Sequence, residues 1–289
     1  MKLRTVNLLL YAHEVDMGGL RVRQPIPTNQ VQQIDPFLLL HHAKVKVPDD
    51  RDPRHAGVGP HPHRGFSPVT FIFEGGVHHR DSRGNDQVIY AGGAQWMDAG
   101  MGIIHSERPA TNIHEIGSQQ EIIQVWINTP AKEKMDPPRY FPLSTENVPV
   151  VSLDEGRVNV KVFSGALLGV QGAIPSKSTI NAATITIQPH GKVTIEVPQY
   201  HNALIYLLDG KLKVDGFGLV ESLHLVHYKN DGEGIALQAL EKTRVLFLSA
   251  PPLQESVVSY GPFVMNTQTE IMEAMRDYQM GKMGVLIEE

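Results

Sequence analysis

Short apolar segments separated by glycine and proline constrain the fold of this sequence more than any other feature. The chain of 289 residues contains 26 glycines and 20 prolines, and they interrupt its first 260 residues before a long amphipathic helix can form. Segments between them, such as 158–162 (VNVKV), alternate apolar and polar residues with the period of a half-buried strand. Asp-Gly pairs at 209–210, 215–216 and 231–232 are turn signals. The pattern predicts an all-β protein, either a sandwich or a barrel.

The last residues depart from this pattern. Thr267 and Glu270 have the spacing of a capping box at the start of a helix, and the glycine at 281 can end it. Ile271, Met275 and Tyr278 would then share one helical face. We expect a short C-terminal helix near residues 267–280, packed through this face against the body of the protein.

A faint internal repeat indicates two domains of similar design. Residues 69–75 (VTFIFEG) resemble 204–210 (LIYLLDG), and residues 126–130 (WINTP) resemble 247–251 (FLSAP). The stretch MDPPRYFPLSTENVPV at 135–150 is rich in proline and polar residues, as a connection between domains would be. We predict one domain over 1–145 and a second over 146–289, which includes the helix.

The composition excludes several classes of function. No cysteine occurs, so disulfides, thiolate nucleophiles and cysteine ligands are ruled out, and any metal must be held by His, Asp or Glu. The net charge of -5 and a pI near 6.3 argue against a protein that binds nucleic acid through its phosphates.

The N-terminus could be misread as a signal peptide, because two basic residues precede the short run LLLYA. His13, Glu14 and Asp16 follow at once, so we interpret this run as a first strand. No apolar run approaches the ~20 residues that a membrane span needs. We expect a cytoplasmic protein that does not contact membranes.

Two pairs of potential ligands carry the chemistry of the sequence. His61 and His63 are spaced by two, and so are His105 and Glu107 further along the chain. Residues i and i+2 of an extended segment point the same way, so each pair can reach one point. A single H-x-H pair is more often two loop histidines. The two pairs together, in an all-β chain without cysteine, predict a site for a divalent first-row transition ion with open positions for water, O2 or a substrate oxygen.

Other polar and aromatic residues have less specific patterns. Neighbouring residues on a strand face opposite ways, so His78 and His79 cannot both point at one ion. His79 or Asp81 could orient a ligand or line a pocket, and a solvent-facing hairpin is the alternative. Trp96 and Met97 are more typical of a core than of a substrate platform. The sequence Gly-Met-Gly at 100–102 lacks the third glycine and the βαβ context of a dinucleotide loop.

Several of these segments together resemble the pirin family of the cupin superfamily, over essentially the whole chain. The segments are VR at 22–23, DPFL at 35–38, HPHRGF at 61–66, FEG at 73–75, QWM at 95–97, AGMGIIHSE at 99–107 and YGPFVMNT at 260–267. The resemblance implies a bicupin, with two antiparallel β-barrels face to face and a metal only in the N-terminal one. The family's ligands fall on His61, His63, His105 and Glu107, the same four residues that the spacing selects.

The resemblance also implies the identity of the ion, which in this family is usually iron. We expect one divalent transition metal, Fe(II) first, with manganese, nickel, copper, cobalt or zinc as alternatives. The C-terminal barrel is expected to be structural. If Gly75 corresponds to Gly210, Glu196 and Pro198 take the places of the first two histidines, and no H-x-E follows. The histidines at 224 and 227 have the wrong spacing for one strand face.

The sequence departs from the family pattern at two places. Ser67 and Pro68 stand where many pirins have a glutamate after the second histidine, which could alter the surroundings of the site. His41 and His42 stand where pirins tend to carry an acidic pair. Near a pocket they would change its charge, and otherwise they have no chemistry of their own.

The resemblance suggests an enzyme. Some pirins act as quercetin 2,3-dioxygenases, so we expect a flavonol-like substrate and O2, with Glu107 as a catalytic residue that takes the proton of the flavonol hydroxyl. The alternative is a redox-sensitive adaptor that binds transcription factors or metabolic enzymes through a protein surface. A metal-binding barrel with another natural substrate is a third interpretation, because fold does not fix function.

Overall fold

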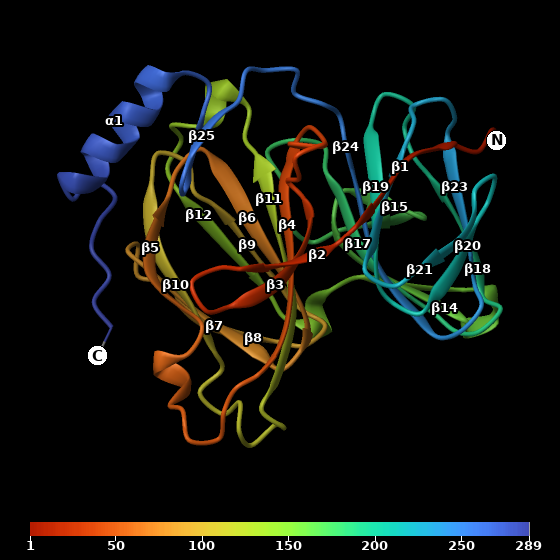
Figure 1. Ribbon diagram of the computed structural model, residues 1–289, viewed down its shortest axis with the longest axis horizontal. Helices are drawn as coiled ribbons and strands as arrows, with labels where there is room; N and C mark the ends of the chain where they lie inside the picture. The colour runs from red at the N-terminus through yellow and green to blue at the C-terminus, as the bar shows by residue number, and fades with distance from the viewer. Residues whose placement is uncertain (289) are drawn as a thin grey trace. The chain divides into compact units, whose positions relative to one another are not determined.

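The computed structural model describes residues 1–288, and most of its regular secondary structure is β-strand, so the prediction of an all-β fold is confirmed (Figure 1). The chain divides into two compact units. Unit 1 combines Met1–His13 with Asn147–Pro252, and unit 2 combines Glu14–Glu146 with the chain from Leu253 onward. Both units contain a seven-stranded and a four-stranded antiparallel sheet.

Unit 2 has sheet orders β12-β9-β6-β11-β4-β3-β2 and β5-β10-β7-β8. Its strands are β2 (His13–Asp16), β3 (Arg21–Ile26), β4 (Phe37–Lys46), β5 (Val58–His63), β6 (Phe66–Glu74), β7 (Gly76–Asp81), β8 (Asp86–Tyr90), β9 (Ala94–Asp98), β10 (Ile103–Pro109), β11 (Gln119–Asn128) and β12 (Arg139–Leu143). Short 3-10 helices lie at Pro53–His55, Ala131–Glu133 and Thr145–Asn147.

Unit 1 has sheet orders β1-β22-β19-β24-β17-β14-β13 and β18-β23-β20-β21, with a small β15-β16 ribbon and a 3-10 helix at Asp154–Gly156. Its strands are β1 (Val6–Tyr11), β13 (Val150–Leu153), β14 (Val158–Ser164), β15 (Ala166–Leu167), β16 (Val170–Gln171), β17 (Asn181–Ile187), β18 (Lys192–Glu196), β19 (Asn202–Asp209), β20 (Lys211–Val214), β21 (Gly218–Glu221), β22 (His224–Tyr228), β23 (Gly234–Ala239) and β24 (Thr243–Ala250). One large cluster of valine, isoleucine and leucine side chains fills the space between these strands.

The predicted domain ranges, 1–145 and 146–289, differ from these units at both ends of the chain. The run LLLYA does form a strand, but this strand, β1, pairs antiparallel with β22 and so belongs with the second half of the sequence. The segment from Leu253 onward belongs with the first half. Its Phe263, Met265 and Ile271 form a buried cluster against which Ile104 of β10 packs. Tertiary pairing, which short sequence patterns do not encode, decides both assignments.

The C-terminal segment contains the one α-helix of residues 1–288. After the strands β25 (Val258–Tyr260) and β26 (Phe263–Met265), the helix α1 runs over Gln268–Gln279 (blue in Figure 1). Thr267 caps it, and the predicted capping box with Glu270 is present. Ile271 is buried, whereas Tyr278 is 41% exposed, so the apolar face is narrower than predicted. No helix in the described residues has the length and hydrophobicity to span a membrane.

Candidate metal centre

Strand pairing brings three of the predicted ligands together. His61 and His63 lie at the end of β5 and face the same way, as the alternation of a strand requires. Strand β10 pairs antiparallel with β5, and this pairing sets His105 opposite His61 and Ile103 opposite His63. The ligand atoms of the three histidines all lie within 4.8 Å of one another, and no other such group of acidic or histidine side chains occurs in residues 1–288.

The hydrogen bonds of the rings determine which nitrogens face the centre. The Nδ1 atom of His61 lies 2.8 Å from the carbonyl oxygen of Gly59, and that of His63 lies 3.4 Å from the carbonyl oxygen of Pro262. A carbonyl oxygen only accepts, so in both rings Nδ1 carries the proton and Nε2 carries a lone pair. The Nε2 atom of His61 is nonetheless 3.0 Å from Nε2 of His63 and 3.0 Å from Nε2 of His105. A cation between these nitrogens would satisfy their lone pairs.

The chemistry of these donors fits a transition ion. Burial lowers the pKa of His63 and of His105 well below the usual value, and the neighbouring imidazoles lower both further. Both rings are therefore neutral near pH 7, the form in which histidine binds metal. The two Nε2–Nε2 separations of 3.0 Å are short enough for each pair of rings to bind one ion.

Glu107 lies outside this group of three. The register between β5 and β10 shifts between His105 and Glu107, so the last predicted ligand does not continue the alternation. Its carboxylate accepts hydrogen bonds from Thr70 Oγ1 at 2.9 Å and from Gln95 Nε2 at 2.8 Å on one oxygen, and from Gln124 Nε2 at 2.6 Å on the other. Glu107 as a fourth ligand stays a prediction.

Two further donors fix the amides that hold Glu107. The hydroxyl of Tyr140 donates to Gln95 Oε1, and the indole nitrogen of Trp126 donates to Gln124 Oε1, both at 3.1 Å. Each amide oxygen is thus occupied, and each NH2 group must turn to the carboxylate. Thr70 and Gln124 are functional candidates that no motif in the sequence marks. The available signal was a polar residue on the inward side of an otherwise apolar strand, since Gln124 stands between buried Ile123 and Val125.

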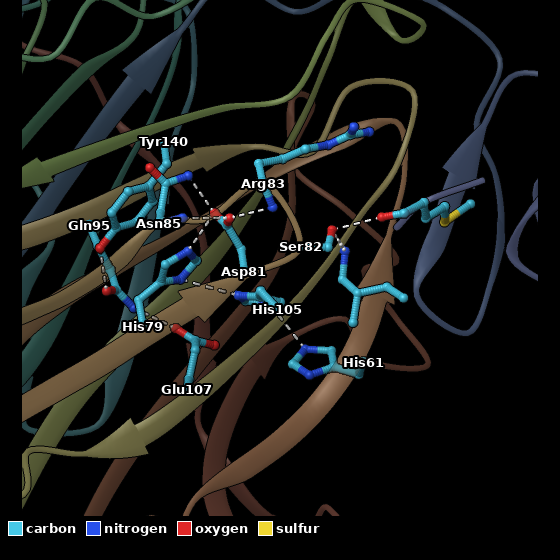
Figure 2. A network of polar contacts seen from close by, with 12 residues as sticks. His61, His79, Asp81, Ser82, Arg83, Asn85, Gln95, His105, Glu107 and Tyr140 are labelled. Carbon is cyan, nitrogen blue, oxygen red and sulfur yellow. Dashed lines mark hydrogen bonds and ion pairs between the residues drawn. The ribbon is translucent and has the colours of Figure 1, made fainter. Parts of the chain in front are cut away.

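His79 and Asp81 form a second support behind His105 (Figure 2). His79 Nε2 lies 3.0 Å from Asp81 Oδ2, and His79 Nδ1 lies 3.5 Å from His105 Nδ1. The Tyr140 ring stacks on His79 with centroids 4.0 Å apart and planes 6° apart. His79 and Asp81 are 1% and 4% exposed, so these two residues do not belong to a solvent-facing hairpin.

A cavity of about 500 Å³ adjoins the histidines. His61, His63 and Glu107 line one part of it, and the rest of the lining is largely apolar and comes from β4 and β11 and from the loops within 17–20 and 47–57. The indole of Trp126 also borders it. A protein pocket of this size can enclose a small organic molecule.

The two departures from the family pattern have different surroundings. His41 lines the cavity and bonds Gln24 Oε1 at 2.6 Å, and burial lowers its pKa to about 4, so it is neutral near pH 7. His42 faces the other side of β4, where it pairs with Glu121 at 3.2 Å. Ser67 donates to Asp98 at 2.7 Å.

Trp96 is 1% exposed and belongs to the core, as expected.

Known proteins resemble this chain along most of its length. The family model described as pirin matches residues 19–127, and the one described as pirin C-terminal cupin domain matches residues 182–284. Pirin-like protein 2 of Arabidopsis thaliana is 35% identical over 274 residues, which are 92% of this chain and 81% of the relative.

Solved structures share the fold. A quercetin 2,3-dioxygenase from Acinetobacter baumannii superposes with a TM-score of 0.91 at 33% identity, covering 99% of this chain and 100% of the other. A bacterial pirin from Escherichia coli, solved in complex with nickel(II), gives a TM-score of 0.67 at 18% identity over 85% of this chain and 99% of the other. The predicted class of two cupin domains is confirmed. Family models match both halves of the chain, and a pirin-like relative is 35% identical over 92% of this chain. The chain therefore belongs to the pirin family.

Proposed function

We propose that this protein is a metal-dependent dioxygenase that cleaves quercetin-type flavonols with O2. The observation that carries the proposal is the position of the histidines. Three Nε2 atoms converge beside a largely apolar cavity of about 500 Å³, so a bound ion and an aromatic substrate would meet there. The high similarity to a solved quercetin 2,3-dioxygenase supports the same reaction class.

His61, His63 and His105 would hold the ion, and Glu107 is proposed as its fourth ligand. Fe(II) is the proposed metal, and nickel, manganese, copper, cobalt or zinc would fit the same donors. When bound, the ion supplies Lewis acidity toward the flavonol oxygens and the one-electron chemistry that O2 requires. In the overall reaction both atoms of O2 enter the product, and one ring carbon leaves as carbon monoxide.

The chain's own residues orient the substrate and take its proton. The apolar walls of β4 and β11, with Trp126, would bind the flat rings and exclude water. Glu107 faces the same cavity and is held by three neutral donors, so its carboxylate is fixed and able to accept. We propose that it accepts the proton of the flavonol 3-hydroxyl.

The test uses protein loaded with Fe(II) without oxygen, to which quercetin and air are then added. Quercetin absorbance and O2 consumption are followed together for wild type, for His61→Ala and for the control His224→Ala, whose side chain lies in unit 1. Equal loss of both reactants, abolished by the first substitution and kept by the second, is the expected result.

Metal that binds to the wild type without any turnover of flavonol would overturn the proposal. The adaptor role, or an enzyme with another substrate, would then take its place.

A further inference from the structure

We propose that Asp81 and His79 are positioning residues that fix the tautomer of His105, so that its Nε2 lone pair faces the metal. The idea rests on the metal site of the proposed function. Among the three histidines, His61 and His63 have backbone carbonyls as partners for Nδ1. His105 has a side chain in that place, the ring of His79. Its tautomer therefore depends on residues that can be substituted.

The carboxylate of Asp81 is the point where several dashed lines of Figure 2 meet. Its Oδ1 accepts from the backbone N–H groups of Arg83 at 2.8 Å and Asn85 at 3.1 Å. Its Oδ2 accepts from the side chain of Asn85 at 2.7 Å and faces His79 at 3.0 Å. Burial alone would raise the pKa of Asp81, but its hydrogen bonds outweigh burial and lower the pKa, and three of them come from the N–H groups of Arg83 and Asn85 whatever the tautomer of His79. An ionised carboxylate only accepts, so His79 Nε2 must donate.

The direction of each following bond is then determined. Of the two neutral tautomers of His79, only the one that donates from Nε2 fits the carboxylate, and in that tautomer Nδ1 is the acceptor. The nitrogen of His105 opposite it, 3.5 Å away, must carry the proton. This leaves Nε2 of His105 as a lone pair, and that atom faces His61 Nε2 at 3.0 Å. The stacked ring of Tyr140 keeps His79 in the plane that this chain of bonds needs.

The substitution Asp81→Asn should reverse the direction of these hydrogen bonds with almost no change in side-chain shape. The backbone N–H groups of Arg83 and Asn85 require an oxygen at the Oδ1 position, so the new NH2 group faces His79 Nε2. The side-chain amide of Asn85, which donates to Oδ2 in the wild type, must then turn its own oxygen toward this NH2 group. His79 must then donate from Nδ1, and His105 must accept at Nδ1 and carry its proton on Nε2. That proton occupies the lone pair which the ion needs.

The matched control is Asp86→Asn. Asp86 and His78 form the same kind of pair, at 2.6 Å, on the neighbouring strands β8 and β7, but the Asp86 side chain is 64% exposed. Its loss should leave the tautomer of His105 and the affinity for metal unchanged.

Two measurements test the proposal. Long-range 1H–15N NMR of metal-free, 15N-histidine-labelled protein gives the tautomer, and we expect His105 as Nδ1–H in wild type and as Nε2–H in Asp81→Asn. Titration with Co(II) should show affinity weakened by about 10- to 100-fold in that variant. If Asp81→Asn does not fold, His79→Phe keeps the stacking on Tyr140 but removes the acceptor, and His105 should then populate both tautomers.

Nε2–H in the wild type, or unchanged tautomer and Co(II) affinity within twofold in Asp81→Asn, would overturn the proposal. Because the tautomer is measured without metal or substrate, this result is distinguishable from the failure of the proposed reaction. A wild type that never turns over flavonol would refute that reaction and leave the tautomer assignment standing.

Discussion

The two units repeat one strand plan with opposite interiors. In the four-stranded sheets, β5-β10-β7-β8 of unit 2 corresponds in order to β18-β23-β20-β21 of unit 1. His105 lies opposite His61 in unit 2, whereas the matching pair of strands in unit 1 sets apolar residues opposite one another, such as Leu237 and Val193. In the larger sheets, Gln124 opposite Thr70 corresponds to Phe247 opposite Ile205, and both of these are fully buried. One backbone plan thus accepts either a polar centre or an apolar core, and a few inward positions decide which.

The largest effect should come from replacing two histidines of unit 2 by apolar residues of the kind that fill unit 1. In His61→Val/His105→Leu, we expect complete loss of stoichiometric metal binding. The metal-free protein should be at least as stable as wild type, because buried lone pairs that face each other are removed. Metal content by elemental analysis and thermal unfolding of the metal-free protein measure the two effects. A full equivalent of metal in this variant would mean that the centre lies elsewhere.

A substitution in the core of unit 1 should change the stability of the protein and leave its affinity for metal unchanged. Phe247 is 0% exposed and belongs to the cluster that fills unit 1. Phe247→Ala should cost about 3–5 kcal/mol of the free energy of unfolding, the usual loss for a buried aromatic side chain. Urea unfolding measures this loss, and Co(II) titration of the native protein should give the wild-type affinity. A parallel loss of metal affinity would show that metal binding also depends on the core of unit 1.

The next largest effect should come from removing one of the hydrogen-bond donors to Glu107. Gln124→Leu copies the apolar character of unit 1 and removes the 2.6 Å donor to one carboxylate oxygen. A buried acceptor left without its donor costs about 1–3 kcal/mol, so we expect kcat with quercetin to fall roughly tenfold or more. Gln238→Leu, on β23 of unit 1, is the control. Unchanged kcat in Gln124→Leu would show that the position of Glu107 does not depend on this amide.

How far the sequence predicts these features depends on the range of the interactions. The H-x-H spacing places His61 and His63 on one strand face, and the cap at Thr267 marks the helix, because both are local effects. The pairing of β1 with β22 joins residues more than 200 positions apart, and in β1 only Leu10 is buried, so no periodic signal marks the partner.

The surroundings of the site were harder to predict for the same reason. Thr70, Gln95 and Gln124 come from three different strands and meet at Glu107 only through the register of the sheet. The bulge between His105 and Glu107 also breaks the simple alternation from which a four-ligand site was expected. Register is a property of paired strands, and a single sequence does not specify it.

The smallest effect is a loss of stability at acidic pH, which we expect in both units. His41 in unit 2 and His201 in unit 1 are each buried, and burial lowers the pKa of each to about 4, with the charge of Arg4 adding to the shift at His201. Their pKa in the unfolded chain is about 6.5, so the unfolded state binds more protons between these values. The stabilisation is complete above pH 6.5 and is lost as the pH falls toward 4. At pH 5.5 each histidine should reduce the free energy of unfolding by about 1 kcal/mol relative to pH 7.5.

Urea unfolding of wild type, His41→Gln and His201→Gln at the two pH values measures this loss. Each substitution should make the protein less sensitive to acid by about 1 kcal/mol, because glutamine does not titrate in this range. Equal reductions would indicate that burial acts alike in the polar and the apolar unit. If only His201→Gln changed the pH dependence, the cavity beside His41 would have to admit enough water to solvate its charged form, and the interior of unit 2 would then differ from that of unit 1 in hydration as well as in polar residues.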